Sequence, residues 1–458
     1  MSIKFINRES ELKALNSRYM ENKPHFMVIY GRRRVGKTEL IKQFYNDKPH
    51  VYHLADKSAS RDQIRRIVKR ISDAFNERPP LIEAWEELFS YVKEKNKKLI
   101  LVFDEFPYLV ESDKAVPSFF QKGWDEYLKD SEVFLILCGS SVRMMERDVL
   151  SSKSPLFGRR TGQLRIDPLR FKEAMLFFPK YSIETAIECY SILGGIPLYL
   201  REFSDEASLA ANIKKMLAKD SILYEEPIFL LREELREPST YSALLEKIAE
   251  GSTKMNDIST KTGIDVHKLP KYLKVLENLH LIERITPVTV SKAKSKQTLY
   301  IIKDDFFRFW YYFVFPFRSE IEGGRDDFVM SQIKSRLGSF TSAAFEKICR
   351  EFLAESGSYN KVGRWWHKDN EIDVVALNEQ TKEILFAECK WQDGVNAGKI
   401  LASLREKAKL VQWNNESRKE RFAVFAKSFR DREKPKEPDV TLFDLKDIER
   451  TLRQRGGN

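Results

Sequence analysis

The sequence predicts an α/β protein that begins with a parallel sheet covered by helices on both faces. Two observations predict this fold class: short apolar runs alternate with amphipathic stretches from Phe26 to about Gly139, and a glycine-rich turn follows the first run. A third observation is a pair of apolar runs that carry Asp373 and Glu388 near the C-terminus. It predicts a second α/β domain, and the sequence between the two domains is mainly helical in pattern.

The elements of the first domain follow from the spacing of apolar residues. Four apolar runs bounded by polar residues have the composition of buried strands, and three stretches between them have helical spacing. This alternation favours parallel strands, because a parallel pair needs a crossover connection. The expected strands are 26–30, 51–54, 99–103 and 134–138, and the expected helices are 39–45, 62–74 and 118–129.

The turn after the first strand matches the pattern G-x-x-x-x-G-K-[ST] of a P-loop. Gly31 and Gly36 let the backbone curl so that successive N–H groups face one anion. Lys37 is expected to reach the β- and γ-phosphates, and the Thr38 hydroxyl to bind Mg²⁺. A strand before the turn and a helix after it favour this interpretation over a structural glycine turn. The predicted ATP-binding residues are Gly31, Arg32, Arg33, Arg34, Val35, Gly36, Lys37, Thr38, Glu39 and Ser140.

A nucleotide site also needs a carboxylate that holds the metal. The buried run LILVF ends in Asp104 and Glu105. We expect Asp104 to hold Mg²⁺ through its water shell and Glu105 to polarise the attacking water. Ser140 ends the next strand, where it would either sense the γ-phosphate or simply cap the strand.

The sequence after this strand contains further candidate functional residues, with weaker support. Arg159 and Arg160, in SPLFGRRTG, are candidate arginine fingers that act in cis or from a neighbouring copy, and a finger in trans would require an assembly. Exposed, solvated arginines are the alternative. Gly194-Gly-Ile-Pro197 suits either a lid behind the nucleotide or a plain turn.

The middle of the chain has the order of a winged helix-turn-helix. Helices are expected at 241–250, 255–262 and 268–280, and a hairpin from 281–289 and 298–302. Pro270 must lie in the first turn of the third helix, where its missing N–H is tolerated. The third helix would offer Lys268, Lys271 and Lys274 to a DNA groove, and the hairpin loop carries Lys292, Lys294 and Lys296. The alternative is a domain that packs on the ATPase and binds protein.

A second acidic site is predicted near the C-terminus. We expect a linker at 318–327, a helix at 336–355, strands near 363–366, 371–377, 384–390 and 422–426, and a helix at 402–412. If Leu377 faces Ile384 across a turn, Asp373 lies opposite Glu388, about 5 Å away, and the like charges favour a divalent cation between them.

Two further residues would complete this second site. Lys390 points to the same face as Glu388 and would position a water, and Glu346 on the preceding helix would complete the metal ligands. The alternative is an ordinary ion pair between Lys390 and Glu371.

The composition limits the classes of protein to which this chain could belong. The formal net charge is +11 over 458 residues, which suits an anionic partner such as DNA. Four scattered cysteines give no zinc pattern and fit a reducing, cytoplasmic compartment. The N-terminus lacks the apolar core of a signal peptide, and the aromatic stretch 306–317 is too short to cross a bilayer.

The chain resembles the archaeal-type P-loop ATPases, which lie within the AAA+-like and signal-transduction ATPase group and carry a C-terminal domain of unknown function. The resemblance rests on FINRESELKAL, GRRRVGKT, VFDEF, SPLFGRRTGQL, GGIPLYL and GRWWHKDNEIDVVA…ECKW. It implies ATP and Mg²⁺ binding, a winged-helix segment, and an end domain similar to PD-(D/E)xK restriction-endonuclease-like nucleases. Two departures from those nucleases are Ile372, where many have proline, and the absence of a Gln-x-x-x-Tyr element after Lys390.

The expected organisation is a P-loop ATPase core (1–169), a helical lid (170–235), a winged helix-turn-helix (236–320) and a nuclease-like α/β domain (328–458). The leading hypothesis is an ATP-hydrolysing protein that acts on DNA and cuts it with Mg²⁺. The alternative is a nucleotide-gated switch that binds DNA or protein without cutting. A chaperone-like ATPase that acts on protein is a third hypothesis.

Overall fold

The computed structural model describes residues 5–290, 297–430 and 437–455. The chain divides into two compact units, Met1–Pro168 and Leu169–Asn458. Within the described ranges, no helix is both long and apolar enough to cross a membrane.

The first unit is a five-stranded parallel sheet with strand order β2-β3-β4-β1-β5. The strands are β1 (His25–Tyr30), β2 (His50–Leu54), β3 (Leu99–Asp104), β4 (Val133–Gly139) and β5 (Gly162–Arg165). The four predicted strands are therefore present. β5 was not predicted, because its four residues GQLR are half exposed and lack an apolar run.

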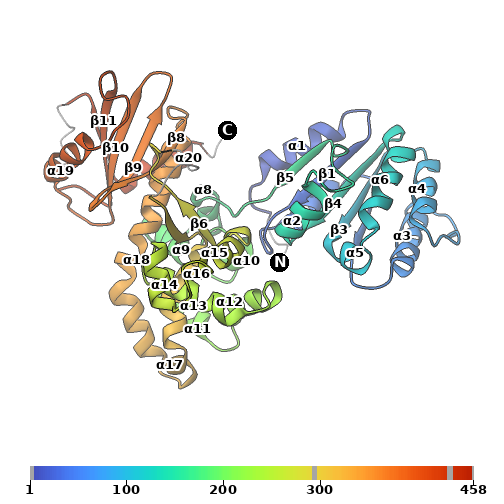
Figure 1. Cartoon of the computed structure of the whole chain (residues 1–458), viewed down its shortest axis with the longest axis horizontal. Helices are drawn as coiled ribbons and strands as arrows, with labels where there is room; N and C mark the ends of the chain where they lie inside the picture. The colour runs from blue at the N-terminus through green and yellow to red at the C-terminus, as the bar shows by residue number, and fades with distance from the viewer. Residues whose placement is uncertain (1–4, 291–296, 431–436, 456–458) are drawn as a thin grey trace. The chain divides into compact units, whose positions relative to one another are not determined.

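Helices cover both faces of this sheet (Figure 1). They are α1 (Glu9–Tyr19), α2 (Lys37–Tyr45), α3 (Ser60–Phe75), α4 (Trp85–Glu94), α5 (Phe106–Ser112) and α6 (Val116–Glu126). The core cluster joins Ile67 of α3, Leu88 of α4 and Phe120 of α6 to one face of the strands. On the other face, Phe44 of α2 packs against Phe134 of β4. The alternation of strand side chains explains these two layers.

The last predicted helix of this unit ends earlier than expected. The prediction extended it to residue 129, but α6 ends at Glu126 and a short 3₁₀ turn, Leu128–Asp130, follows. A π-helical segment, Met145–Leu150, and a loop then lead to β5.

The second unit begins with helices around an aromatic core. They are α8 (Phe171–Ala174), α9 (Ile183–Leu193), α10 (Pro197–Leu200), α11 (Leu209–Leu217), α12 (Ile222–Glu234) and α16 (Asp305–Phe309). The aromatic stretch is largely buried from Phe306 to Val314: Trp310 Nε1 donates to the Tyr224 carbonyl oxygen at 2.8 Å, and the Tyr311 and Ser242 hydroxyls lie 2.7 Å apart.

Three helices and a small hairpin form the middle of this unit. They are α13 (Pro238–Ala249), α14 (Met255–Thr262), α15 (Leu269–Asn278), β6 (Ile282–Ile285) and β7 (Leu299–Ile302), and the two strands are antiparallel. Pro270 lies in the first turn of α15, as predicted. The loop lysines 292, 294 and 296 lie outside the described residues.

The predicted linker at 318–327 is wrong. α17 (Arg318–Glu322) occupies half of it, and α18 (Asp326–Ala354) begins ten residues before the predicted start at 336. Two acidic residues in the first turn of α18 suit the positive end of the helix, and Val329 and Ile333 are buried at helical spacing. Only 323–325 interrupt the two helices.

The C-terminal part of the second unit contains a five-stranded mixed sheet with order β12-β11-β10-β9-β8. Its strands are β8 (Lys361–His367), β9 (Asn370–Asn378), β10 (Glu383–Lys390), β11 (Lys419–Ala426) and β12 (Val440–Phe443). α19 (Ala397–Lys409) packs Leu404 into the core cluster that contains Phe386, and α18 places Phe352 against Phe425 on the opposite face. β12 and α20 (Leu445–Arg455) were not predicted.

The register of β9 and β10 is the predicted one. Leu377 pairs with Ile384, and the antiparallel ladder continues to Val374 and Ala387, which puts Asp373 and Glu388 at the next position. At the outer edge of this sheet, the Val288 amide donates to the Arg364 carbonyl oxygen at 2.9 Å. The segment after β6 therefore covers the edge of β8, which would otherwise expose unpaired backbone groups.

Candidate functional sites

The loop between β1 and α2 has the backbone that phosphate binding requires. Gly36, the residue before α2, has a left-handed φ of 91°, which favours glycine. A Cβ on Gly31 would lie 2.2 Å from the Ile166 carbonyl oxygen, so only glycine fits beside the end of β5. Arg34, at φ 71°, also adopts the left-handed conformation.

Lys37 is the first residue of α2 and is 6% exposed. Its Nζ donates to the Arg32 carbonyl oxygen at 3.0 Å, which closes the loop on itself. Burial lowers the pKa of Lys37, although Glu105 and Asp104 act to raise it. A buried ammonium at a helix N-terminus fits the phosphates of a nucleotide.

Asp104 ends β3 and is the centre of a hydrogen-bond network. Its Oδ2 accepts hydrogen bonds from Thr38 Oγ1 at 2.8 Å and from the Tyr52 hydroxyl at 2.7 Å, and its Oδ1 accepts one from the Glu105 amide at 2.9 Å. Burial beside Asp104 raises the pKa of Tyr52. Sequence reasoning missed Tyr52, because nothing local shows that β2 lies next to β3.

Glu105 and Ser140 are joined at the ends of β3 and β4. Glu105 Oε2 accepts hydrogen bonds from the Ser140 hydroxyl at 2.8 Å and from its amide at 3.2 Å. Glu105 has a left-handed φ of 52°, which is uncommon for a residue with a side chain. The parallel sheet thus brings Lys37, Thr38, Asp104, Glu105 and Ser140 to one edge.

The other predicted nucleotide residues have local partners. Arg33 Nη2 donates to the Tyr108 hydroxyl at 3.3 Å, and Glu39 forms an exposed ion pair with Lys42 at 3.4 Å. Val35 is buried, and its carbonyl oxygen accepts a hydrogen bond from Arg8 Nη2 at 3.1 Å.

The two candidate finger arginines already have partners within the first unit. Arg159 Nε donates to Asp125 at 2.9 Å, and Arg160 Nη1 donates to the Leu150 carbonyl oxygen at 3.1 Å. A role at the nucleotide would require these bonds to break.

This edge of the sheet fits ATP and Mg²⁺. Lys37 supplies a positive charge at the start of α2, and the adjacent Thr38 hydroxyl and Asp104 carboxylate are oxygen ligands of the kind Mg²⁺ prefers. The residues that would hold the metal are Thr38 and Asp104.

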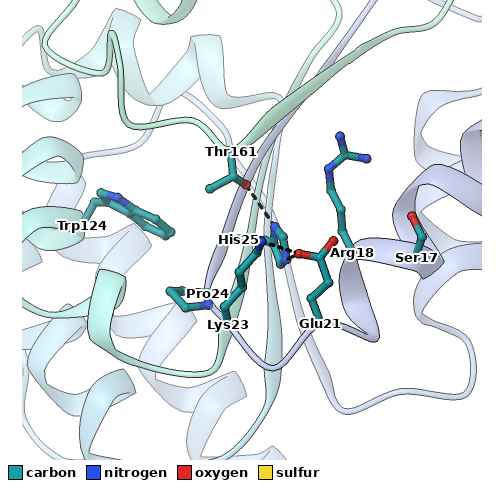
Figure 2. A pocket seen from close by; sticks show the side chains of 8 residues that line it. All are labelled: Ser17, Arg18, Glu21, Lys23, Pro24, His25, Trp124 and Thr161. Carbon is teal, nitrogen blue, oxygen red and sulfur yellow. Dashed lines mark hydrogen bonds and ion pairs between the residues drawn. The ribbon is translucent and has the colours of Figure 1, made fainter.

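A pocket of about 530 Å³ lies at the opposite edge of the same sheet (Figure 2). His25, the first residue of β1, and Thr161, just before β5, line it together with Arg18, Glu21 and Trp124. His25 Nδ1 lies 3.2 Å from the Thr161 hydroxyl oxygen, and Glu21 already pairs with Lys23 at 2.6 Å. This pocket is separate from the loop between β1 and α2, which follows the other end of β1.

In the predicted C-terminal site, two lysines neutralise the charge of a buried carboxylate. Glu388 is 4% exposed, and its two oxygens accept hydrogen bonds from Lys390 Nζ and Lys407 Nζ, each at 2.7 Å. Lys390 Nζ is also 3.8 Å from Asp373 Oδ2, which accepts a hydrogen bond from the Cys389 amide at 2.8 Å. The alternative pairing of Lys390 with Glu371 is wrong, because Glu371 pairs with Arg364.

Burial and neighbouring charges shift the pKa values of two carboxylates at this site. Burial raises the pKa of Asp373 to about 7, and the negative charges of Glu346 and Glu388 add to the effect. Burial also acts to raise the pKa of Glu388, but hydrogen bonds from Lys390 and Lys407 outweigh it and lower that pKa.

Glu346 of α18 belongs to the same cluster. Its buried Oε2 has no hydrogen-bond partner within the described residues, and Arg350 and Arg364 approach it only to 3.6 and 3.4 Å. An incompletely bonded carboxylate oxygen fits a cation. Over the described part of the chain, however, no three His, Cys, Asp or Glu side chains converge closely enough to hold a metal ion. Lys407, Arg350 and Arg364 are the neighbours that the sequence did not reveal.

The lysines predicted to reach DNA lie on α15 and just before it. Lys268, Lys271 and Lys274 are exposed, and Leu269, Leu273 and Leu276 are buried on the opposite side of the helix. Lys274 also lies 3.4 Å from Glu277.

Comparison with known proteins identifies the family to which the chain belongs. A family model described as an ATPase domain found predominantly in Archaea matches residues 5–203, and a model described as "Archaea bacterial proteins of unknown function" matches 310–407. The Methanocaldococcus jannaschii protein MJECL04 is 39% identical over 457 residues, which cover 97% of this chain and 100% of that protein. The chain belongs to this archaeal ATPase family.

Two other similarities agree with the ATPase domain. The ATP-binding protein MJ0423 of M. jannaschii is 50% identical over 46 residues, 10% of this chain and 78% of that protein. The solved Walker-type ATPase PABY2304 of Pyrococcus abyssi matches with a TM-score of 0.52 and 21% identity, over 66% of this chain and 95% of that one. The chain therefore has the α/β fold of a P-loop NTPase in its first unit.

Proposed function

We propose that this archaeal ATPase-family chain binds ATP with Mg²⁺ at the loop between β1 and α2 and hydrolyses it. The observation that carries the proposal is the hydrogen bond from Thr38 to Asp104 beside buried Lys37. When bound, Mg²⁺ polarises phosphoryl oxygens and neutralises their charge. Lys37 and the start of α2 hold the phosphates, Glu105 orients a water, and Ser140 fixes the Glu105 carboxylate.

Phosphate release from ATP tests this proposal. Lys37→Met should reduce hydrolysis by at least about 100-fold, because it removes a buried positive charge that faces the phosphates. Lys42→Met is the matched control, since Lys42 lies on the same helix, is exposed and pairs with Glu39. Equal hydrolysis by wild type and Lys37→Met would reject the assignment of the site.

We propose a second function for the β9–β10 hairpin, which is Mg²⁺-dependent cleavage of DNA. Asp373, Glu388 and Lys390 lie on adjacent strands in the order of a D…E-x-K site. Lys390 forms ion pairs with both carboxylates. The winged-helix interpretation of α13 to β7 and the net charge of +11 support DNA as the partner. In this proposal Asp373, Glu388 and Glu346 would hold the metal only after they move closer together than in this structure and Glu388 releases a lysine, and Lys390 would position a water.

Cleavage of linear, circular and single-stranded DNA with Mn²⁺, with and without ATP, tests the second function. Cutting should vanish in Asp373→Asn and persist in Glu379→Gln, a control at the far end of the same hairpin whose carboxylate pairs with Lys361. Lys37→Met shows whether ATP controls the cutting.

The competing function is a nucleotide-gated switch that binds DNA or protein without cutting. A lysine donates a hydrogen bond to each oxygen of Glu388, so the carboxylate charge is neutralised without a metal. This arrangement favours a switch that does not cut DNA. Intact DNA with wild type, together with equal DNA affinity in wild type and Asp373→Asn, would support the switch.

A further inference from the structure

The pocket at the start of β1 contains a buried nitrogen atom without a hydrogen-bond partner (Figure 2). His25 is 3% exposed, and its ring packs on Phe134 with the ring centroids 5.3 Å apart. Its Nε2 forms no hydrogen bond within the described residues, and Glu21 Oε2 approaches it only to 3.5 Å. An unpaired buried polar atom is destabilising, so this nitrogen favours an oxygen atom brought by a ligand.

The Thr161 hydroxyl decides whether this nitrogen can donate. The hydroxyl oxygen accepts a hydrogen bond from the Phe26 amide at 2.9 Å. Its own hydrogen has two acceptors, the Phe26 carbonyl oxygen at 3.3 Å and His25 Nδ1 at 3.2 Å. When the hydroxyl donates to Nδ1, the neutral ring carries its hydrogen on Nε2. Nε2 is then an N–H donor in need of an acceptor.

Arg18, in the last turn of α1, supplies a positive charge to the same pocket. Its Nη1 donates to the Ala14 carbonyl oxygen at 3.0 Å, and it forms no ion pair within the described residues. Gly162, next to Thr161, leaves room for this side chain, because a Cβ there would lie 3.1 Å from Arg18 Nε. The guanidinium therefore keeps donors for a carboxylate or a phosphate, whose geometry it matches.

The other two charged side chains that line the pocket are Glu21 and Lys23, and they pair with each other at 2.6 Å. Together with Arg18 they give the lining one net positive charge when His25 is neutral. Glu21 is 42% exposed and Lys23 is 63% exposed, and an exposed ion pair of this kind contributes little to stability. An entering anion can therefore replace Glu21, whereas an entering cation would meet Arg18.

Trp124 and Pro24 give the pocket an apolar side. The Trp124 ring packs on Phe26 of β1 with the ring centroids 5.3 Å apart, which fixes its position. The volume of about 530 Å³ lies within the range of small-molecule sites, which is about 300–1,000 Å³. An anion with an apolar part fits this lining better than an inorganic ion does.

We propose that this pocket binds a small organic anion. Its carboxylate or phosphate group accepts hydrogen bonds from Arg18 and His25 Nε2, and its apolar part lies against Trp124. The pocket and the loop between β1 and α2 are at opposite ends of β1, so the inference does not depend on nucleotide binding.

Titration of the full chain with small aromatic anions, followed through the NMR signals of the ligand, tests the inference. Benzoate and phenyl phosphate carry the two candidate charged groups on the same ring. Phenol carries the ring without the anion, and acetate and inorganic phosphate carry the anion without the ring. We expect the tighter of the two aromatic anions to bind at least about tenfold more tightly than its separate parts. The tighter one identifies the charged group, and titrations of Lys37→Met exclude phosphate bound at the loop between β1 and α2.

Four variants assign the binding to this pocket. Arg18→Met removes the charge, and His25→Phe removes Nε2 but keeps a ring against Phe134, so each should weaken binding at least about tenfold. Lys13→Met is the matched control, because Lys13 is exposed on α1 and does not line the pocket, and it should leave the affinity unchanged. Glu21→Gln removes the competing carboxylate and should strengthen binding about two- to fivefold. Such a gain cannot result from loss of folding.

The pH dependence of benzoate binding gives a second measurement. Burial lowers the pKa of His25, and Glu21 opposes the shift. The neighbouring charges of Lys23, Arg18 and Lys98 add to it. A bound anion beside Nε2 favours the protonated ring, so benzoate affinity should rise as pH falls from about 8 toward about 6, where carboxylates stay charged. His25→Phe should lose this dependence, and Arg18→Met should keep it.

The outcomes are decisive for the pocket. The inference is overturned if wild type binds neither aromatic anion, or if Arg18→Met and His25→Phe bind both as tightly as wild type does. An unchanged or weaker affinity in Glu21→Gln also overturns it. Binding that Lys37→Met retains supports the pocket even if the chain proves not to hydrolyse ATP.

Discussion

Thr38 Oγ1 donates a hydrogen bond to Asp104 Oδ2 over 2.8 Å, although sixty-six residues separate them in the chain. Thr38 follows β1 and Asp104 ends β3, and β4 lies between these two strands in the sheet. The contact therefore bridges the end of the intervening strand. A hydroxyl and a carboxylate reach one point because parallel strands end at the same edge.

Glu105 and Ser140 should contribute unequally to ATP hydrolysis. Glu105→Gln removes the carboxylate that we propose orients water, so we expect ATP to bind and hydrolysis to fall about 100-fold or more. Ser140→Ala leaves the hydrogen bond from its amide to Glu105, and the loss should be about tenfold or less. Nucleotide binding and phosphate release measure the two effects. A larger loss in Ser140→Ala than in Glu105→Gln would contradict these roles.

Tyr52→Phe should destabilise the first unit without changing its packing. The substitution removes a 2.7 Å hydrogen bond to buried Asp104, and a bond to a charged group contributes about 1.5–3 kcal/mol. Chemical denaturation measures the change in the free energy of unfolding. Tyr45→Phe is the control, since Tyr45 stacks on His50 and its hydroxyl is not among the donors to Asp104. Equal effects of the two substitutions would show that the hydrogen bond adds nothing.

Gly31→Ala should disrupt the loop and ATP binding together. The new methyl group would lie 2.2 Å from the Ile166 carbonyl oxygen, so backbone must move, and we expect a loss of at least about 1–3 kcal/mol in stability. Gly338→Ala is the opposite case, because nothing lies within 4 Å of its Cβ position in α18, and alanine should stabilise that helix by up to about 1 kcal/mol. Thermal unfolding compares the stabilities of the two variants. A Gly31→Ala variant as stable as wild type would contradict the packing argument.

The stability of the first unit should fall in mild acid because of His53. This side chain is 1% exposed, and burial lowers its pKa from 6.5 to about 4, although the hydrogen bond with Gln63 opposes the shift. Between these pKa values the unfolded chain binds more protons than the folded one, so stability rises with pH and is lost as pH falls from 6.5 toward 4. The full contribution is roughly 3 kcal/mol. His53→Gln should flatten this part of the thermal unfolding profile, and an unchanged slope would reject the assignment.

Replacing the three α15-region lysines with glutamine should weaken DNA binding in a salt-dependent way. Lys268, Lys271 and Lys274 are exposed on one side of the helix, and each phosphate contact contributes about 0.9 to the slope of log affinity against log salt concentration. We expect the triple variant to lower that slope by up to about 3. The control replaces three lysines at the C-terminal end of α11 and just after it, namely Lys214, Lys215 and Lys219. Equal slopes in the two triple variants would assign DNA binding to charge in general and not to α15.

Local sequence determined much of the nucleotide edge. The spacing of glycines, Lys37 and Thr38 identifies the loop without any knowledge of the sheet, because these residues act within one turn of backbone. The apolar run that ends in Asp104 likewise predicts a strand with a carboxylate at its end. The register of β9 and β10 was also predictable, since a short polar turn joins the two strands and fixes which residues face each other.

Local sequence could not find features that depend on distant neighbours. Half-exposed β5 is a strand only because it pairs with β1, and half of the predicted linker is a helix that buries its one aliphatic side chain, Ile321. Tyr52 joins Asp104 only through the strand order, and Lys407 joins Glu388 only through the packing of α19 on the sheet. Sequence by itself determined which chemical groups are present and which short turns they form, because those depend on adjacent residues. Tertiary structure alone decided which of the groups meet, because strand order and helix packing are set by burial of the whole apolar surface.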